Sequence, residues 1–396
     1  MLSRRHFLEL SLLTALASCT SPGDYSGDDV ERLERQKSDE SAHSGKGPFG
    51  PLRFRGYHGL ATLPYFRVGE DGLLHTVVDL PAVIDFHAHL GWSYFLAPTV
   101  DLQRRTARTE YLMDCDAQDP PCGLDLDVYV NANFTDGMHR SLSWQTISSL
   151  WIGSRSAATH TIPNLLAEMQ AAKVGQAAIL PIAINLPLSA DATLQVVDGI
   201  DKAGAKERLI PFASVHPHDP NKRALLQQYA HRGVRGVKLH PEMQRFFPDE
   251  NGALEIYEEC GRLGLPIIFH AGRTGIEPEF MRPYALLRRY VAGIRQFPAV
   301  RFVLGHAGAR DIEDAIPLAR EHDNVWLELS SQGVTRIADL LDKVGARKLL
   351  YGTDWPFYPL AVALAKVLIV TENNPEARAA ILGGNALELL KPSTSS

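Results

Sequence analysis

Short aliphatic runs return at a nearly constant interval through most of the chain, and this interval limits the fold more than any other feature. Each run that we predict as a strand is followed by a helical pattern, and from the second run on the strand ends are 24 to 36 residues apart. That interval matches the ~30 residues of a strand–helix unit. The predicted strands are Val83–His89, Ala177–Ile184, Leu209–Val215, Gly236–His240, Pro266–His270, Arg301–His306, Val325–Ser330 and Lys348–Asp354.

Amphipathic segments fill the intervals between these strands. They are Asn164–Lys173, Asp191–Gly204, Lys222–Arg232, Ala253–Gly264, Pro278–Gln296, Arg310–His322, Thr335–Gly345 and a final helix at Pro375–Leu390. Eight strands that alternate with helices predict an α/β fold, the (β/α)₈ TIM barrel, over residues 82–391. The alternative is an open doubly wound sheet, which usually has a Gly-rich phosphate turn after its first strand. Residues 85–90 read Asp-Phe-His-Ala-His-Leu, so we prefer the barrel.

Two additions to the barrel are predicted. A long insertion, at about residues 92–160, follows the first strand and is expected to form a lid or side wall over the barrel mouth. Its Cys115 and Cys122 could form a disulfide, and its acidic residues are expected to be a solvated loop rather than a calcium site. A short N-terminal extension, residues 52–81, contains a β-hairpin of Tyr65–Val68 and Leu73–Val78.

The N-terminus carries two export motifs in order. Residues 3–8, Ser-Arg-Arg-His-Phe-Leu, resemble the twin-arginine export signal, and the apolar run that follows is too short to span a bilayer. Residues 16–19, Leu-Ala-Ser-Cys, resemble a bacterial lipobox, whose cysteine is lipidated. We therefore predict a signal peptide at residues 1–18, lipidation of Cys19, and an exported protein anchored to a bacterial membrane that faces the periplasm or the cell exterior.

Residues 19–51 are rich in Ser, Gly, Asp and Glu and have few aliphatic residues. They predict a flexible tether, in which Asp28–Glu40 is at most transiently helical. The formal net charge of −6, without a Lys/Arg-rich patch, gives no indication of nucleic-acid binding. The partners that we expect are a small-molecule substrate and the lipid anchor in the membrane, and a homodimer is left open.

Polar residues gather at the predicted strand ends. His87 and His89 share one face of the first strand, because residues two apart in a strand point the same way. His270, His306 and Asp354 end the fifth, sixth and eighth strands. The carboxyl ends of barrel strands meet at one mouth, where barrel enzymes place their chemistry. Neutral imidazole and carboxylate suit Zn²⁺ and similar ions, which lower the pKa of a bound water to ~7.

The motifs at these strand ends, D-x-H-x-H, G-V-K-L-H-P, H-A-G, G-H-A-G and G-T-D-W-P, resemble the amidohydrolase superfamily. The resemblance is to its amidohydrolase-2 branch, which includes metal-dependent hydrolases and decarboxylases of the aminocarboxymuconate-semialdehyde type. It implies a divalent metal, with Zn²⁺ favoured and one ion rather than two. The implied ligands are His87, His89, His270 and Asp354. Asp354 would also be the general base, and His306 would bind the developing oxyanion.

Other residues of the mouth have less certain roles. Lys238 and His240 share a face of the fourth strand and could bind metal or substrate; some members of the superfamily carry a carboxylated lysine there. Substrate contacts are predicted for Arg273, Trp92 and Trp355. Glu328, on the seventh strand, is expected to be a structural ion-pair partner rather than an acid that supports the site.

These features predict a metal-dependent hydrolase that uses activated water on an amide, ester or lactone carbonyl. The alternative on the same site is non-oxidative decarboxylation of an aromatic or enol acid. A third hypothesis is a lipoprotein that binds a solute without catalysis. The G-x-S-x-G and P-loop patterns are both missing from the sequence.

Overall fold

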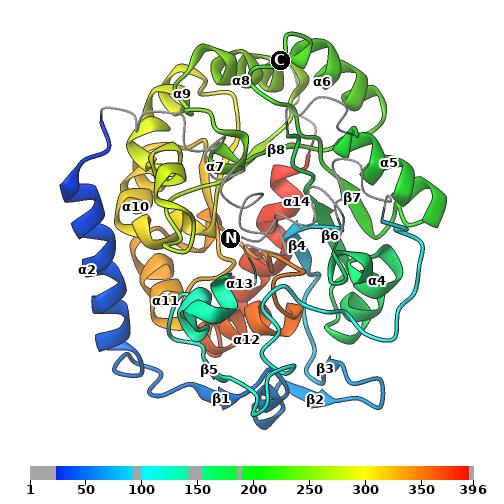
Figure 1. Cartoon of the computed structure of the whole chain (residues 1–396), viewed down its shortest axis with the longest axis vertical. Coiled ribbons are helices and arrows are strands. Elements are labelled where there is room, and N and C mark those ends of the chain that lie inside the picture. Colours follow the sequence, from blue (N-terminus) through cyan, green and yellow to red (C-terminus); the bar gives the residue numbers. More distant parts are fainter. Residues whose placement is uncertain (1–23, 92–99, 141, 143–153, 185–189, 392–396) are drawn as a thin grey trace, which may run out of the picture.

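The computed structural model describes residues 24–91, 100–140, 142, 154–184 and 190–391. Its centre is a ring of eight parallel strands enclosed by helices (Figure 1). The pairing runs from β4 through β12, and the bridges Ala213↔Val237 and Ala88↔Trp355 close the ring. The predicted (β/α)₈ barrel is therefore confirmed. The barrel strands are β4 (Ile84–Ala88), β6 (Gln176–Ile179), β7 (Leu209–Pro211), β8 (Val237–Leu239), β9 (Ile267–His270), β10 (Phe302–Gly305), β11 (Val325–Glu328) and β12 (Leu349–Leu350).

Most strands end earlier than their aliphatic runs predict. His306 directly follows β10, and Asp354 lies four residues after the end of β12, with φ of 56° and 58°. This left-handed backbone cannot continue a strand. These two residues therefore stand on turns at the barrel mouth, whereas His87 and His270 lie within β4 and β9.

The outer helices follow the predicted order, except that the segment Pro278–Gln296 is broken and that α12 was not predicted. They are α4 (Ile162–Ala171), α5 (Ala192–Ala203), α6 (Lys222–His231), α8 (Asn251–Leu263), α10 (Ile312–Glu321), α11 (Val334–Lys343), α12 (Leu360–Val370), α13 (Pro375–Ala379), a π-helical turn η8 (Ala380–Gly384) and α14 (Asn385–Leu389). The segment predicted as a helix at Pro278–Gln296 is instead broken into η4 (Glu279–Ala285), η5 (Leu287–Arg289) and α9 (Val291–Gln296). Pro283 lacks a backbone N–H, and Leu286 is extended, so no continuous helix forms there.

The N-terminal extension and the insertion pack together on one side of the barrel. The predicted hairpin is confirmed as β2 (Phe66–Val68) and β3 (Leu74–Thr76), with Phe66 opposite Thr76. Before it, β1 (Arg53–Arg55) and η1 (His58–Thr62) occur, and β1 pairs antiparallel with β5 (Gly123–Asp125) of the insertion. Further along, Val130 N–H, at the start of η2 (Val130–Asn133), donates to Ser331 O beyond β11. This part of the insertion thus forms a side wall of the barrel.

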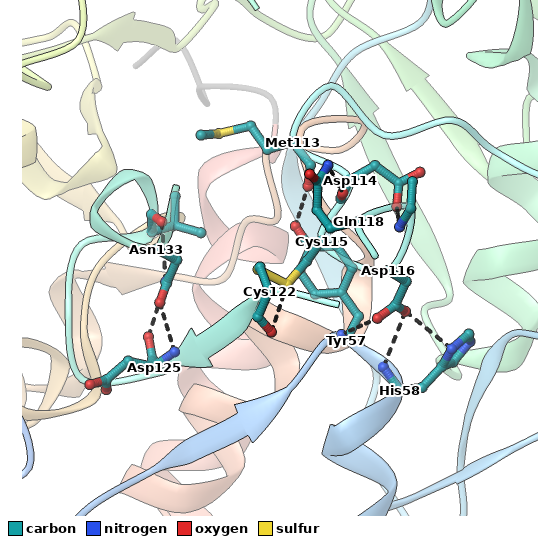
Figure 2. The surroundings of a disulfide bond; sticks show 12 residues. Tyr57, His58, Met113, Asp114, Cys115, Asp116, Gln118, Cys122, Asp125 and Asn133 are labelled. Atoms are coloured by element: carbon teal, nitrogen blue, oxygen red, sulfur yellow. Dashed lines mark hydrogen bonds and ion pairs between the residues drawn. A yellow bond between two sulfur atoms is a disulfide. The ribbon is translucent and has the colours of Figure 1, made fainter. Parts of the chain in front are cut away.

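A disulfide joins Cys115 and Cys122 in the insertion (Figure 2). Beside it, the Asp116 carboxylate accepts hydrogen bonds from the backbone N–H groups of Tyr57 and His58 (Figure 2). Asp125 likewise binds Ser44 and Arg53. Asp116 and Asp125 are therefore partners of neighbouring segments, which corrects the prediction of a solvated loop for these two residues, whereas Asp119 is exposed.

The predicted flexible tether is wrong over Gly27–His43, which forms the helix α2 along the barrel beside α10 and α11 (Figure 1). Leu33 is fully buried, and Asp29 Oδ1 forms an ion pair with Arg288 Nη1 at 2.8 Å. Arg310 pairs with Glu40 at 3.0 Å. Matched charges, rather than a wide apolar face, hold this helix in place. No helix among the described residues is long and apolar enough to cross a membrane.

Candidate metal centre

Two histidines and an aspartate meet where the first and last barrel strands lie side by side. The N–H of Asp354 donates to the carbonyl of His87 at 2.7 Å, which fixes the turn after β12 against β4. The Asp354 Oδ1 atom lies 3.5 Å from His87 Nε2 and 3.4 Å from His89 Nε2. The strand geometry predicted from the sequence therefore brings three of the four implied ligands together.

The second nitrogen of each of these rings is already bound. His87 Nδ1 lies 2.7 Å from Glu328 Oε2, and His89 Nδ1 lies 2.6 Å from the carbonyl oxygen of Leu180. These acceptors fix the ring orientation and direct each Nε2 toward Asp354, as outer hydrogen bonds do in metal sites. Glu328 thus supports the site directly, which corrects its interpretation as only a structural ion-pair partner.

His306 and His270 complete the cluster on the opposite side. Ligand atoms of His87, His306 and Asp354 all lie within 4.8 Å of one another. His306 Nε2 is 3.0 Å from His270 Nδ1, and His306 Nδ1 is 2.8 Å from Ser330 Oγ. The structure thus places His306, which we predicted as an oxyanion contact, in the group of ligand atoms, and places His270, an implied ligand, next to His306 but outside that group.

Lys238 and His240 also face this cluster. Lys238 Nζ lies 3.1 Å from His87 Nε2, and burial lowers the lysine pKa to about 8. The His240 ring stacks on His270, with centroids 4.1 Å apart. Both residues are therefore at the site, as predicted from the fourth strand.

The protonation states of the cluster fit a divalent cation. Burial holds the pKa values of His87, His270 and His306 below the ordinary histidine value, so the rings are neutral and have a lone pair to donate. Burial alone would raise the pKa of Asp354, but His87, His89 and His306 together lower it, so the side chain is a carboxylate. Neutral imidazoles around one carboxylate are a donor set that suits Zn²⁺ and related ions.

Comparison with known proteins agrees with this geometry. The family model described as amidohydrolase matches residues 84–391. The chain belongs to the amidohydrolase family. The members of this family are metal-dependent enzymes, so the chain is an enzyme, and the hypothesis that it binds a solute without catalysis is wrong. No curated protein matches the chain significantly.

Among solved structures, a TIM-barrel protein from Bordetella bronchiseptica is 21% identical with a TM-score of 0.51, and covers 60% of this chain and 85% of its own. An amidohydrolase from Burkholderia multivorans with bound HEPES is 16% identical with a TM-score of 0.50, and covers 78% and 99%. A 2,6-dihydroxybenzoate decarboxylase from Rhizobium is 14% identical with a TM-score of 0.47, and covers 78% and 99%. The first two support the fold of this amidohydrolase.

The loops that carry His270 and His306 are in close contact in this amidohydrolase. Gly272 has φ of 75°, and a Cβ atom there would lie 1.9 Å from the carbonyl oxygen of Gly308. Only glycine allows this approach. Gln332, which the sequence did not single out, donates to the carbonyl oxygens of His306 and Ala309 and so supports the turn after β10.

Two predicted substrate contacts are wrong, and a third cannot be placed. Arg273 is buried and paired with Asp311 through two nitrogens, at 2.8 and 2.5 Å, so its guanidinium is not available to a substrate. Trp355 is fully buried, and its indole N–H donates to Glu168 at 2.8 Å. Trp92 and the predicted lipidation site Cys19 lie outside the described residues.

Asp85, one step deeper than His87 on β4, stabilises the junction that forms the site. Its carboxyl group accepts hydrogen bonds from Thr353 Oγ1 at 2.6 Å and from the N–H groups of Thr353 and His87 at 3.0 Å. Burial raises the pKa of Asp85 to about 8. This residue therefore ties β4 to the turn that carries Asp354.

Proposed function

We propose that this amidohydrolase is a hydrolase that acts on an amide, ester or lactone carbonyl with one divalent ion, Zn²⁺ being favoured. The observation that carries the proposal is the position of the Asp354 carboxylate, within 3.5 Å of the Nε2 atoms of His87 and His89. His87, His89, Asp354 and either His270 or His306 would hold the ion. When bound, the ion supplies Lewis-acid activation of water and of the substrate carbonyl.

The chain's own groups supply the proton transfers. Asp354 is an ionised carboxylate at the mouth and accepts a proton from the attacking water; it later returns a proton to the leaving group. His306 is buried beside it and is held through Nδ1 by Ser330. Because the Ser330 hydroxyl donates to Glu328, it accepts the Nδ1–H of His306, and the neutral ring presents the lone pair of Nε2 to the site. His306 can therefore hold the ion or accept a proton, and it would bind the developing oxyanion only as an imidazolium.

The test is the Asp354→Asn variant, assayed on a panel of amides, esters and lactones with metal content measured in parallel. The amide keeps an oxygen donor but cannot accept the proton. We expect retained metal and a ~10²–10⁴-fold loss of kcat. Wild-type turnover in this variant would contradict the assignment of Asp354 as the base.

A non-oxidative decarboxylase is the second candidate for the same site. The observation in its favour is Lys238, a buried amine at the centre of the cluster that could neutralise a substrate carboxylate. Release of carbon dioxide from an aromatic or enol acid, without net hydrolysis, would favour this reaction. Water-dependent cleavage of a neutral ester, amide or lactone would favour the hydrolase.

We further propose export and lipid anchoring through Cys19. The Arg4-Arg5 pair and the Leu16–Cys19 motif support this proposal, and the Cys115–Cys122 disulfide agrees with an oxidising compartment. Metabolic labelling with a radioactive fatty acid in a bacterial host tests it. Label should enter the wild-type chain and be absent from Cys19→Ser; equal label in both would contradict anchoring at this residue.

A further inference from the structure

Two buried polar atoms beside the candidate metal centre have no hydrogen-bond partner among the described residues. They are His270 Nε2 and Glu242 Oε1. The other carboxylate oxygen, Glu242 Oε2, lies 3.4 Å from His270 Nε2. The Glu242 side chain is only 4% exposed. A buried polar group without a partner costs about 1–3 kcal/mol, so this pair requires a functional or structural reason.

The backbone that carries Glu242 is held firmly. Glu242 lies on α7 (Pro241–Gln244), the single turn that follows β8. Gln244 donates to the carbonyl oxygens of Ala183 and Val215 at 2.9 and 3.0 Å, and its own side-chain oxygen accepts from the N–H of His240 at 2.8 Å. These bonds tie the turn to two neighbouring strand ends and so hold the backbone of Glu242 beside His270.

The His270 ring is fixed on its other sides as well. Its Nδ1 atom lies 3.0 Å from Nε2 of His306, which belongs to the cluster with His87 and Asp354. The His240 ring stacks on it at an interplanar angle of 8°. The two nitrogens of His270 therefore have separate surroundings, with Nδ1 toward the metal centre and Nε2 toward Glu242.

We propose that Glu242 is a positioning residue that accepts the Nε2–H of His270 and so reserves the Nδ1 lone pair for the divalent ion. A ring nitrogen can bind a metal only when it carries no proton, and an acceptor on the opposite nitrogen selects that tautomer. This inference rests on the proposed metal centre but adds a residue that the strand-end motifs do not contain. Glu242 does not itself touch substrate.

The first test measures zinc affinity by competition with a chromophoric chelator in Glu242→Leu and Glu242→Gln. Leucine cannot accept the proton, so we expect ~10–100-fold weaker zinc binding. Glutamine retains a side-chain oxygen that accepts the same proton, so its affinity should stay within a few-fold of wild type. Glu258→Leu is the matched control, because Glu258 on α8 is exposed and forms an ion pair with Arg223 on α6.

The second test reads the tautomer of His270 in the zinc-loaded wild-type protein and needs no destabilising variant. Two-bond ¹H–¹⁵N spectra of histidine-labelled protein distinguish Nε2–H from Nδ1–H, and the His270→Gln spectrum assigns the signals. We expect Nε2–H. A proton on Nδ1, or wild-type zinc affinity in folded Glu242→Leu, would overturn the role of Glu242 alone. A wild-type chain that binds no divalent ion would overturn the metal centre itself.

Discussion

Replacement of Glu328 by Gln tests whether this buried carboxylate holds the metal-site histidines in place. Glu328 is fully buried and accepts four hydrogen bonds, from His87 Nδ1, from the N–H of His306, and from both the N–H and the hydroxyl of Ser330. Gln has the same shape, but its NH₂ group replaces one acceptor oxygen. Both Glu328 oxygens accept hydrogen bonds, so in either orientation the NH₂ group of Gln faces at least one buried N–H or O–H group, which is then left without an acceptor.

The expected magnitude follows from this count of donors. One buried donor without an acceptor costs about 1–3 kcal/mol of the free energy of unfolding. A neutral amide oxygen is also a weaker acceptor for His87 than a carboxylate, and loss of such an outer partner lowers metal affinity by ~10–100-fold. That loss corresponds to about 1.4–2.7 kcal/mol. Glu328→Gln should therefore lose both stability and zinc affinity.

The assay pairs urea unfolding with competition for zinc against a chelator. Glu313→Gln is the matched control, because Glu313 is an exposed partner of Arg336 at 3.1 Å and should change either quantity by less than about 0.5 kcal/mol. A folded Glu328→Gln protein with wild-type zinc affinity would refute the reasoning, because Glu328 would then act on stability alone.

Three further predictions concern the loops, a buried acid and the N-terminal helix. Gly272→Ala places a Cβ against Gly308 O and should lower the free energy of unfolding in urea by about 3 kcal/mol or more. The control Gly345→Ala has a similar φ but open space around the Cβ, so it should lower this free energy by only about 1–2 kcal/mol. Equal losses in the two variants would contradict the contact with Gly308. Burial raises the pKa of Glu168 from 4.5 to about 7, so between these values the unfolded chain releases a proton that the folded chain keeps. Wild-type stability should therefore fall by about 3 kcal/mol relative to Glu168→Gln as the pH rises from 4.5 to 7, and parallel pH profiles would contradict this. Leu33→Ala should weaken the docking of α2 by about 2–5 kcal/mol and so speed proteolytic cleavage within residues 24–51. Equal cleavage rates in the wild-type and variant proteins would contradict the docking of this helix.

The barrel and the convergence at its mouth could be predicted because both follow from local patterns. The spacing of the aliphatic runs sets the number of strands, and parallel strands in a closed ring place their carboxyl ends together. The sequence alone therefore groups His87, His89 and Asp354. The helix α12 escaped prediction for an equally physical reason. Residues 360–368 are all buried, so the helix has no polar face and no helical period of hydrophobicity.

The errors over Arg273 and the tether concern pairings between charged residues that lie far apart in the sequence. Arg273 follows His270 by three residues, which suggests a substrate contact, but Asp311 and the backbone of Asp29 take up its guanidinium. Asp29 in turn pairs with Arg288. Neither an exposed nor a buried ion pair leaves a periodic signal, since each needs only one residue on each segment. The composition of residues 19–51 thus correctly indicates little apolar burial, but it does not exclude a docked helix when the barrel supplies arginines opposite its acids. The same pairings connect α2 to the loops that follow His270 and His306, so the stability of this helix and the geometry of the metal centre should change together.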